Sequence, residues 1–187
     1  MIQETIITSL GKNGYVHISP MGVHVDDDHY IIMPFRPSTT LDHILATRHA
    51  VMNHTDDVRV FAGCLTGRRD WPLTDTVVVN GKRLENCLSH QELELVYVEN
   101  DHQRPKLYCK IVHQQTHLPF KGFNRAQFAV LEAAILVSRL SMLPLQKINS
   151  ELEYLEIAIN KCAGERELEA WEWLMQAVDQ FRREHRH

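Results

Sequence analysis

The chain has 187 residues, 44% of them hydrophobic and 24% charged, with a formal net charge of −4 at pH 7. This composition is ordinary for a globular protein, and the length suffices for one core, with or without an appended subdomain. The negative net charge gives no electrostatic reason to expect a nucleic-acid partner. The first residues, MIQETIITS, lack a basic segment followed by an apolar run, so we expect no signal peptide and a cytoplasmic location.

Neither a membrane span nor a disulfide framework is predicted. The most apolar helical stretch, residues 126–143, contains Glu132 and Arg139, and charged side chains are costly inside a bilayer. The four cysteines are far apart and show no paired spacing, which predicts reduced structural thiols rather than disulfides or a zinc site. They are Cys64, Cys87, Cys109 and Cys162.

Alternating polar and apolar residues predict three strands in the first part of the chain, the first two joined by an Asn13-Gly14 turn. They are expected at residues 2–9, 15–25 and 30–35. Pro20 lies inside the second strand, and because proline has no N–H for a strand ladder, it indicates a sheet edge or a bulge. The segment Ser19–Gly22 therefore either leaves backbone groups free to meet a ligand or bends a barrel strand with nothing bound.

No metal site is predicted. The segment Asp26–His29, with His24 beside it, is rich in acids, but aspartate is common in turns because its side chain bonds the local backbone. We therefore interpret this segment as a polar turn. His113 and His117 lie on a predicted strand, where they would be about 13 Å apart and too distant to share a metal. We interpret both as ordinary surface histidines.

The stretch Met33–Asp57 carries the strongest local signal. A strand runs into Arg36, a proline and three hydroxyl residues, followed by a predicted helix over 40–48. The first N–H groups of a helix lack intrahelical partners and attract anions, and an arginine can add a bidentate contact to phosphate. The same residues also fit a plain helix cap, because Thr39 and Asp42 have the spacing of a capping box. Phosphate binding and capping both stay open on these residues alone.

The rest of the chain divides at Phe120, where the apolar period changes from two to about 3.6. We predict a β domain over 1–120 and a helical subdomain over 121–187 that packs on it. Asn53 lies inside a predicted strand, where a buried amide needs a partner from neighbouring backbone or from a ligand. The remaining strands are expected at 50–55, 58–64, 75–79, 93–99 and 106–117, and the remaining helices at 124–143, 146–162 and 165–183.

Two details of the helical part are also predicted. Gly164 is expected to end the helix over 146–162 as its C-terminal cap. Arg125, Glu132 and Arg139 are seven residues apart and so lie along one stripe. That stripe is either the solvated edge of a buried helix or a charged seam at a ligand site or subunit interface.

The sequence shows no motif of a protein-based catalyst. GxSxG, HExxH, CxxC and GxGxxG are all absent, which removes the usual signatures of a serine nucleophile, a metal site and a dinucleotide fold. Many strands with only one short early helix oppose a doubly wound sheet and predict an α+β, mainly β, fold. If the protein is an enzyme, a bound cofactor would supply the chemistry.

The order of these motifs is similar to a known group of proteins. ISPMGV lies in the second strand, PFRPSTT precedes the short helix, and AVMNHTDD follows it. Together they resemble the FMN-binding split-barrel superfamily of flavin reductases and pyridoxamine-phosphate oxidases. GFNRAQFAVLEAAIL followed by SRLSMLP resembles the C-terminal helical extension of one branch of unknown function, known mainly from archaea and from bacteria with methanopterin-linked one-carbon metabolism.

The resemblance implies a split β-barrel with a C-terminal helical subdomain, assembled as a homodimer with FMN at the subunit interface. It also implies a flavin-dependent oxidoreductase that acts on an unknown small molecule. The alternatives are a non-catalytic flavin-binding protein, a barrel that binds another phosphorylated cofactor such as a deazaflavin, and a structural dimer whose turn is only a helix cap.

The same resemblance implies a set of cofactor-binding positions. Backbone donors near Met21 and the amide of Asn53 would tune the flavin ring by hydrogen bonding. Arg36 replaces a lysine that is common in this region of flavin reductases, so its loss should matter more. The FMN phosphate is expected at Arg36, Ser38, Thr39 and Thr40, the ring and ribityl chain at Ser19, Met21, Gly22, Val23, Val51, Met52 and Asn53, and further contacts at Asn124 and Arg125.

Overall fold

The computed structural model describes residues 1–26 and 29–185, so Asp27 and Asp28 of the predicted polar turn lie outside the described residues. The chain divides into two compact units, each with its own hydrophobic core. The β unit comprises residues 1–55 and 70–120, and the helical unit comprises residues 56–69 and 121–187. The predicted packing of one on the other stays a prediction.

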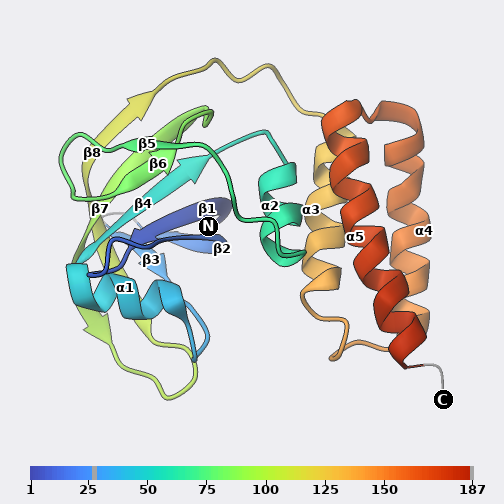
Figure 1. The fold of residues 1–187 in the computed structure, drawn as a ribbon, viewed down its shortest axis with the longest axis horizontal. Helices are drawn as coiled ribbons and strands as arrows, with labels where there is room; N and C mark the ends of the chain where they lie inside the picture. Colours follow the sequence, from blue (N-terminus) through green and yellow to red (C-terminus); the bar gives the residue numbers. More distant parts are fainter. Residues whose placement is uncertain (27–28, 186–187) are drawn as a thin grey trace. The chain divides into compact units, whose positions relative to one another are not determined.

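The β unit is built on a closed antiparallel barrel with the strand order β1-β2-β3-β8-β7-β4 (Figure 1). The strands are β1 (Ile2–Leu10), β2 (Val16–Asp26), β3 (His29–Ile32), β4 (His49–His54), β7 (Ser89–Glu99) and β8 (Lys106–Thr116). Side chains alternate between the two faces of each strand, and Ile7, Met52 and Leu93 are among those that fill the interior. The predicted α+β, mainly β, class is confirmed.

A short helix, α1 (Thr39–Thr47), connects β3 to β4 and follows a cis Arg36–Pro37 peptide bond. Leu41 and Ile44 are its buried apolar residues and belong to the barrel core. They hold the helix against the barrel, where α1 packs on β1, β2 and β4. The start of α1 is therefore fixed relative to the strands around it.

One predicted strand, over 75–79, is wrong. The segment forms a small separate sheet of β5 (Leu73–Asp75) and β6 (Lys82–Leu84), with Val77, Val78 and Val79 in the loop between them. The apolar valine run suggests a strand by composition. In the structure, however, the N–H groups of these valines donate to a side-chain carboxylate instead of to a strand ladder.

A second predicted strand, over 58–64, is also wrong, because this segment forms α2 (Arg59–Leu65). A short apolar run is compatible with a buried strand or a buried helix, and its periodicity does not distinguish them. The contacts decide the matter, since Val58 and Ala62, four residues apart, both belong to the core of the helical unit. The consecutive buried residues are Val60, Phe61, Ala62, Gly63 and Cys64.

The helical unit also contains α3 (Arg125–Val137), α4 (Leu145–Cys162) and α5 (Glu165–Glu184), which lie side by side (Figure 1). The helices over 146–162 and 165–183 are confirmed, whereas α3 is shorter than predicted, with turns at 138–143. Among the described residues, no helix combines the length and apolarity that crossing a membrane requires.

Gly164 does not have its predicted role. Ala163 is the C-cap of α4, and Gly164 is the N-cap of α5, where its N–H donates to Glu167 Oε2 at 2.9 Å. Its φ of −94° needs no glycine-specific conformation. In the predicted charged stripe, Arg125 is exposed and donates to Cys162 Sγ at 3.2 Å, a contact inside the helical unit.

The close packing of α3 leads to a first prediction. Ala129 is completely buried, and α3 packs there against α2, α4 and α5. We expect Ala129→Leu to lower the free energy of unfolding by about 1–3 kcal/mol, because an enlarged side chain forces neighbouring groups apart. Phe128→Ala is the matched control on the exposed side of the same helix and should stay within about 0.5 kcal/mol. Urea unfolding measures both, and a neutral Ala129→Leu would contradict the packing.

The cysteines give a second prediction. Burial raises the pKa of Cys64 to about 11 and that of Cys109 to about 12, and Cys87 is also buried whereas Cys162 is only half-buried. A thiol reacts as its thiolate. We therefore expect Ellman's reagent to modify one thiol per native chain rapidly and all four in denaturant. Cys162→Ser should remove the rapid phase, and rapid modification of Cys64 or Cys109 would contradict these burial assignments.

Candidate functional site

Arg36 presents an exposed positive charge just before α1. Its side chain is exposed and lines a pocket of about 340 Å³ with Asn100, Asp101 and His102. Its backbone N–H donates to the carbonyl oxygen of Gln103 at 2.9 Å, which ties this turn to the β7–β8 loop. In the part of the chain that the structure describes, the guanidinium has no hydrogen-bond or ion-pair partner. It is therefore available to an anion.

The β7–β8 loop brings an acid and a second base beside this turn. Backbone N–H groups of Gln103 and Arg104 donate to Asp101 Oδ1 at 2.8 and 2.7 Å and lower the pKa of this carboxyl. Arg104 donates from Nε to the carbonyl oxygen of Met33 at 3.0 Å, and its guanidinium lies 4.6 Å above the Phe35 ring. Sequence analysis missed Arg104, because nothing in the sequence indicates that this distant loop meets the turn.

The start of α1 is capped, but not by the predicted residue. Ser38 is the N-cap, and its Oγ accepts a hydrogen bond from Leu41 N–H at 3.2 Å. The predicted capping box of Thr39 and Asp42 is therefore wrong by one residue. Of the hydroxyl residues expected around a phosphate, Thr39 is exposed, Ser38 is half-buried and Thr40 is buried. The N–H groups of Thr39 and Thr40 precede the first intrahelical bonds and point out of the helix start.

The free edge of β2 lies at Gly22 rather than at Met21. Val25 N–H donates to the Met1 carbonyl and Gly11 N–H to the Tyr15 carbonyl, which fixes the alternation of the β1–β2 ladder. By that alternation Met21 exchanges hydrogen bonds with Thr5, while Gly22 directs its N–H and C=O away from β1. On that side, β3 pairs with β2 only from His24 onward. The edge that Pro20 indicated is thus present.

Val51, Met52 and Asn53 do not line a surface. All three are buried, and β4 is paired with β1 on one side and β7 on the other. The Asn53 amide is satisfied inside the chain: Nδ2 donates to the Ile6 carbonyl at 3.0 Å, and Oδ1 accepts from Leu84 N–H at 2.8 Å. Neighbouring backbone, not a ligand, is therefore the partner of this amide, and we withdraw these three residues from the flavin contacts.

Asn124 and Arg125 make their described contacts within the helical unit. Asn124 is the N-cap of α3, where its Oδ1 accepts from Ala126 N–H at 2.8 Å, and its Nδ2 donates to the Cys162 carbonyl at 3.1 Å. Arg125 contacts Cys162 Sγ. The predicted flavin contacts of both residues stay predictions.

A cluster of polar side chains on β7 and β8, around the buried His90 and Glu92, has no signal in the sequence. Glu92 is fully buried, and its carboxylate accepts N–H groups of Val77, Val78 and Val79 at 2.7 Å each. Burial acts to raise the pKa of Glu92, but these hydrogen bonds together with that of His90 hold it below its usual value. A buried carboxylate thus stays charged because backbone donors replace its water.

His113 and His117, which we predicted to be ordinary surface histidines, are half-buried and pack against a third histidine of the same cluster, His90. His90 is buried, and its Nε2 lies 3.2 Å from Glu92 Oε1 while its Nδ1 lies 2.9 Å from His117 Nε2. Burial lowers the pKa values of His90 and His117, which favours neutral rings. His113 packs against His90 with ring centroids 5.8 Å apart. Strand pairing brings these rings together, so His90 joins two histidines that are distant along β8.

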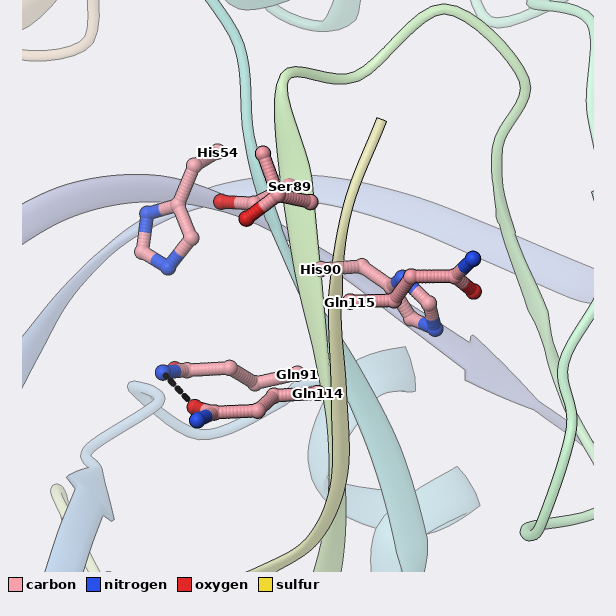
Figure 2. A pocket seen from close by; sticks show the side chains of 7 residues that line it. His54, Ser89, His90, Gln91, Gln114 and Gln115 are labelled. Atoms are coloured by element: carbon pink, nitrogen blue, oxygen red, sulfur yellow. Dashed lines mark hydrogen bonds between the residues drawn. The ribbon is translucent and has the colours of Figure 1, made fainter. Parts of the chain in front are cut away.

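A second pocket, of about 280 Å³, opens beside this cluster. Figure 2 shows its side chains on two sides of β7 and β8: His54, Gln91 and Gln114 on one, His90 and Gln115 on the other. Gln91 Nε2 donates to Gln114 Oε1 at 3.5 Å, while the buried Oε1 of Gln91 has no partner among the described residues. Burial lowers the pKa of His54. The pocket is polar on both sides.

Comparison with known families identifies the chain. Residues 3–118 match the N-terminal domain of the family described as "Protein of unknown function (DUF447)", and residues 124–176 match its C-terminal part. The protein belongs to the DUF447 family. A search of curated proteins returned no match.

Solved structures place the DUF447 chain in the flavin reductase-like split-barrel fold, as predicted. It is similar to an FMN-bound DUF447 protein from Methanosarcina mazei, with a TM-score of 0.80, 18% identity and 94% of each chain covered. A 2-nitrobenzoate 2-nitroreductase from Pseudomonas fluorescens gives a TM-score of 0.54 and 18% identity over 61% of this chain and 64% of that one. An FMN-binding protein from Thermus thermophilus gives 0.51 and 14% identity over 60% and 69%.

The satisfied amide of this DUF447 barrel gives a third prediction. Asn53→Ala should lower the free energy of unfolding by about 1–3 kcal/mol, because it leaves Leu84 N–H buried without its partner. Asn80→Ala removes the same group from an exposed position and should change stability by no more than about 0.5 kcal/mol. Urea unfolding compares the two, and equal small effects would show that the Asn53 amide is dispensable.

Proposed function

We propose that this DUF447 protein binds FMN, with the phosphate held at the start of α1 by Arg36 and the first N–H groups of the helix. The observation that carries the proposal is the exposed guanidinium, unpaired among the described residues, directly before a helix start whose exposed Thr39 has an N–H group without an intrahelical partner. An arginine fork and a helix N-terminus are both suited to a phosphate dianion. The FMN-bound relative of the same family supports this choice of anion.

The surroundings add two elements to the proposed site. Arg104, fixed by the Met33 carbonyl and the Phe35 ring, places a second positive charge next to the Arg36 turn. Gly22 supplies a backbone N–H on the open edge of β2, where a flavin ring edge could accept it. A side chain at Gly22 would crowd this strand, because an added Cβ would lie 3.0 Å from Ile2 Cγ2 and 3.1 Å from Glu4 Oε1.

We further propose a homodimer and an oxidoreductase activity on a small molecule. Several large apolar side chains of the β unit are exposed, as a subunit interface requires. They include Ile2, Tyr15, Phe35, Leu45 and Tyr97. A bound flavin would supply hydride or electron transfer, while the chain's own residues bind and orient it. Light scattering of the purified protein tests the dimer.

The fourth prediction tests the phosphate seat. Arg36→Ala should weaken FMN binding by about 10- to 100-fold, because a charge-assisted hydrogen bond contributes roughly 1.5–3 kcal/mol. Lys12→Ala is the charge-matched control, since Lys12 is exposed in the β1–β2 turn. Calorimetric titration with FMN measures both variants. Unchanged affinity in Arg36→Ala would contradict the seat, and no binding by the parent chain would remove the flavin proposal altogether.

Activity needs a separate assay, since binding does not imply turnover. The purified protein with FMN should oxidise NAD(P)H faster than free FMN does, or be reoxidised faster by its substrate. FMN binding with neither effect would identify a non-catalytic flavin-binding protein. Displacement of FMN by a deazaflavin would instead identify the other phosphorylated cofactor as the ligand.

A further inference from the structure

We propose that His90, Glu92 and His113 form a binding site for one divalent transition-metal ion, with Zn²⁺ as the best-suited ion, which clamps β7 and β8 to the 76–81 loop. The site is independent of the proposed flavin site. It uses one nitrogen from each histidine and one carboxylate oxygen, and these ligand atoms all lie within 4.8 Å of one another.

The spacing of two ligands already suits a metal. His90 Nε2 and Glu92 Oε1 are 3.2 Å apart, and two ligands bound tetrahedrally to zinc are about 3.4 Å apart when each lies about 2.1 Å from the metal. To bind the same ion, the half-buried side chain of His113 has to rotate so that its nitrogen comes closer to the other two ligand atoms. That movement breaks no hydrogen bond at Nε2, because Nε2 makes none to the part of the chain that the structure describes.

The unpartnered nitrogen of His113 points independently to a ligand. His113 Nε2 is buried and, among the described residues, has no hydrogen-bond partner. Buried polar atoms are normally satisfied, because an unpaired one costs free energy. His113 lies opposite Glu92 in the β7–β8 ladder, on the same face as His90. A metal ion bound between these three side chains would satisfy the nitrogen.

The surrounding groups hold the ligands in place, as the outer shell of a metal site does. Glu92 Oε2 accepts Val78 and Val79 N–H, and Oε1 accepts Val77 N–H, so the remaining acceptor direction on Oε1 is the one facing His90 Nε2. When His90 Nε2 binds a metal, its proton resides on Nδ1. There it donates to His117 Nε2, 2.9 Å away.

The ligand set and burial indicate the class of ion and its coordination. Two imidazoles with one carboxylate suit zinc and its neighbours in the transition series, whereas Mg²⁺ and Ca²⁺ prefer oxygen ligands alone. His90 and Glu92 are completely or almost completely buried, and because only three side chains bind, a water molecule would complete the tetrahedron around the ion. The nearby Arg83 opposes a cation, but its guanidinium donates to the carbonyls of Leu84 and Glu85, which offsets part of its charge.

The fifth prediction tests this site on the full chain after treatment with a chelator. Titration with CoCl₂ should produce the visible absorption of tetrahedral Co²⁺ at one equivalent per chain, and ZnCl₂ should displace it and raise the midpoint of thermal unfolding. His113→Ala should weaken Zn²⁺ binding by at least about 100-fold, because it removes a direct ligand. His185→Ala is the control, since His185 is exposed and outside the cluster.

A second variant distinguishes loss of a ligand from loss of the fold. His113→Cys restores a zinc ligand and should recover Co²⁺ binding with an added thiolate-to-cobalt charge-transfer band that the parent chain lacks. No Co²⁺ spectrum in the parent chain, or parental Zn²⁺ affinity in His113→Ala, would overturn the proposal. The result does not depend on FMN, because the titration uses flavin-free protein and has its own spectroscopic readout.

Discussion

Buried polar side chains on the outer face of the barrel hold the segment between α2 and β7 in place. Glu92 accepts three backbone N–H groups, from Val77, Val78 and Val79. Asn53 accepts Leu84 N–H, and Thr8 donates to the Lys82 carbonyl at 2.5 Å. Because an unpaired charge or amide is costly in a protein interior, each of these side chains requires the segment to cover it. In turn, the N–H groups of Val77, Val78 and Val79 depend on Glu92, because they donate to its carboxylate instead of to a neighbouring strand.

The cost of an unpaired polar group in the interior distinguishes two kinds of polar residue, which the sequence alone does not tell apart. Asn53, Glu92 and His90 are buried and make hydrogen bonds within the chain, and the last two are also ligands of the proposed metal site. Arg36 is exposed and unpaired, which is the state expected of a ligand-binding cation. His113 lies between these kinds, since its ring is half-buried and one buried nitrogen has no partner. The phosphate proposal rests on the guanidinium of Arg36, and the metal proposal rests on Nε2 of His113. Neither group has a partner among the described residues.

The helical unit depends on another constraint, the close approach of helices at small residues. Ala126, Ala129 and Ala133 on α3 are completely buried, and they let neighbouring helices pack closely. The apolar run of α2 joins the same core through Val58 and Ala62. The unit is thus assembled from residues 56–69 and residues 121–187. Nothing in the composition of either segment indicates that the two pack together.

Much of the fold and part of the candidate site could be predicted from local residues. The strands with strict alternation, the Asn13-Gly14 turn and the two long C-terminal helices were predicted within a few residues of their observed bounds. The proposed phosphate seat also rests on local residues, because an arginine, a proline and hydroxyls before a helix lie next to one another in the chain. The predictions for 58–64 and 75–79 failed because short valine-rich runs fit several conformations.

The sequence by itself thus determined the elements with a clear period, the α+β class and a cation placed before a helix. The tertiary structure alone decided which polar groups are buried and which remain open. Strand pairing brought His90 to His113 and His117, a side-chain hydrogen bond joined Asn53 to Leu84, and the β7–β8 loop brought Arg104 to the Arg36 turn. Hydrogen-bond partners and desolvation depend on residues far apart along the chain, and for that reason local sequence patterns do not specify them.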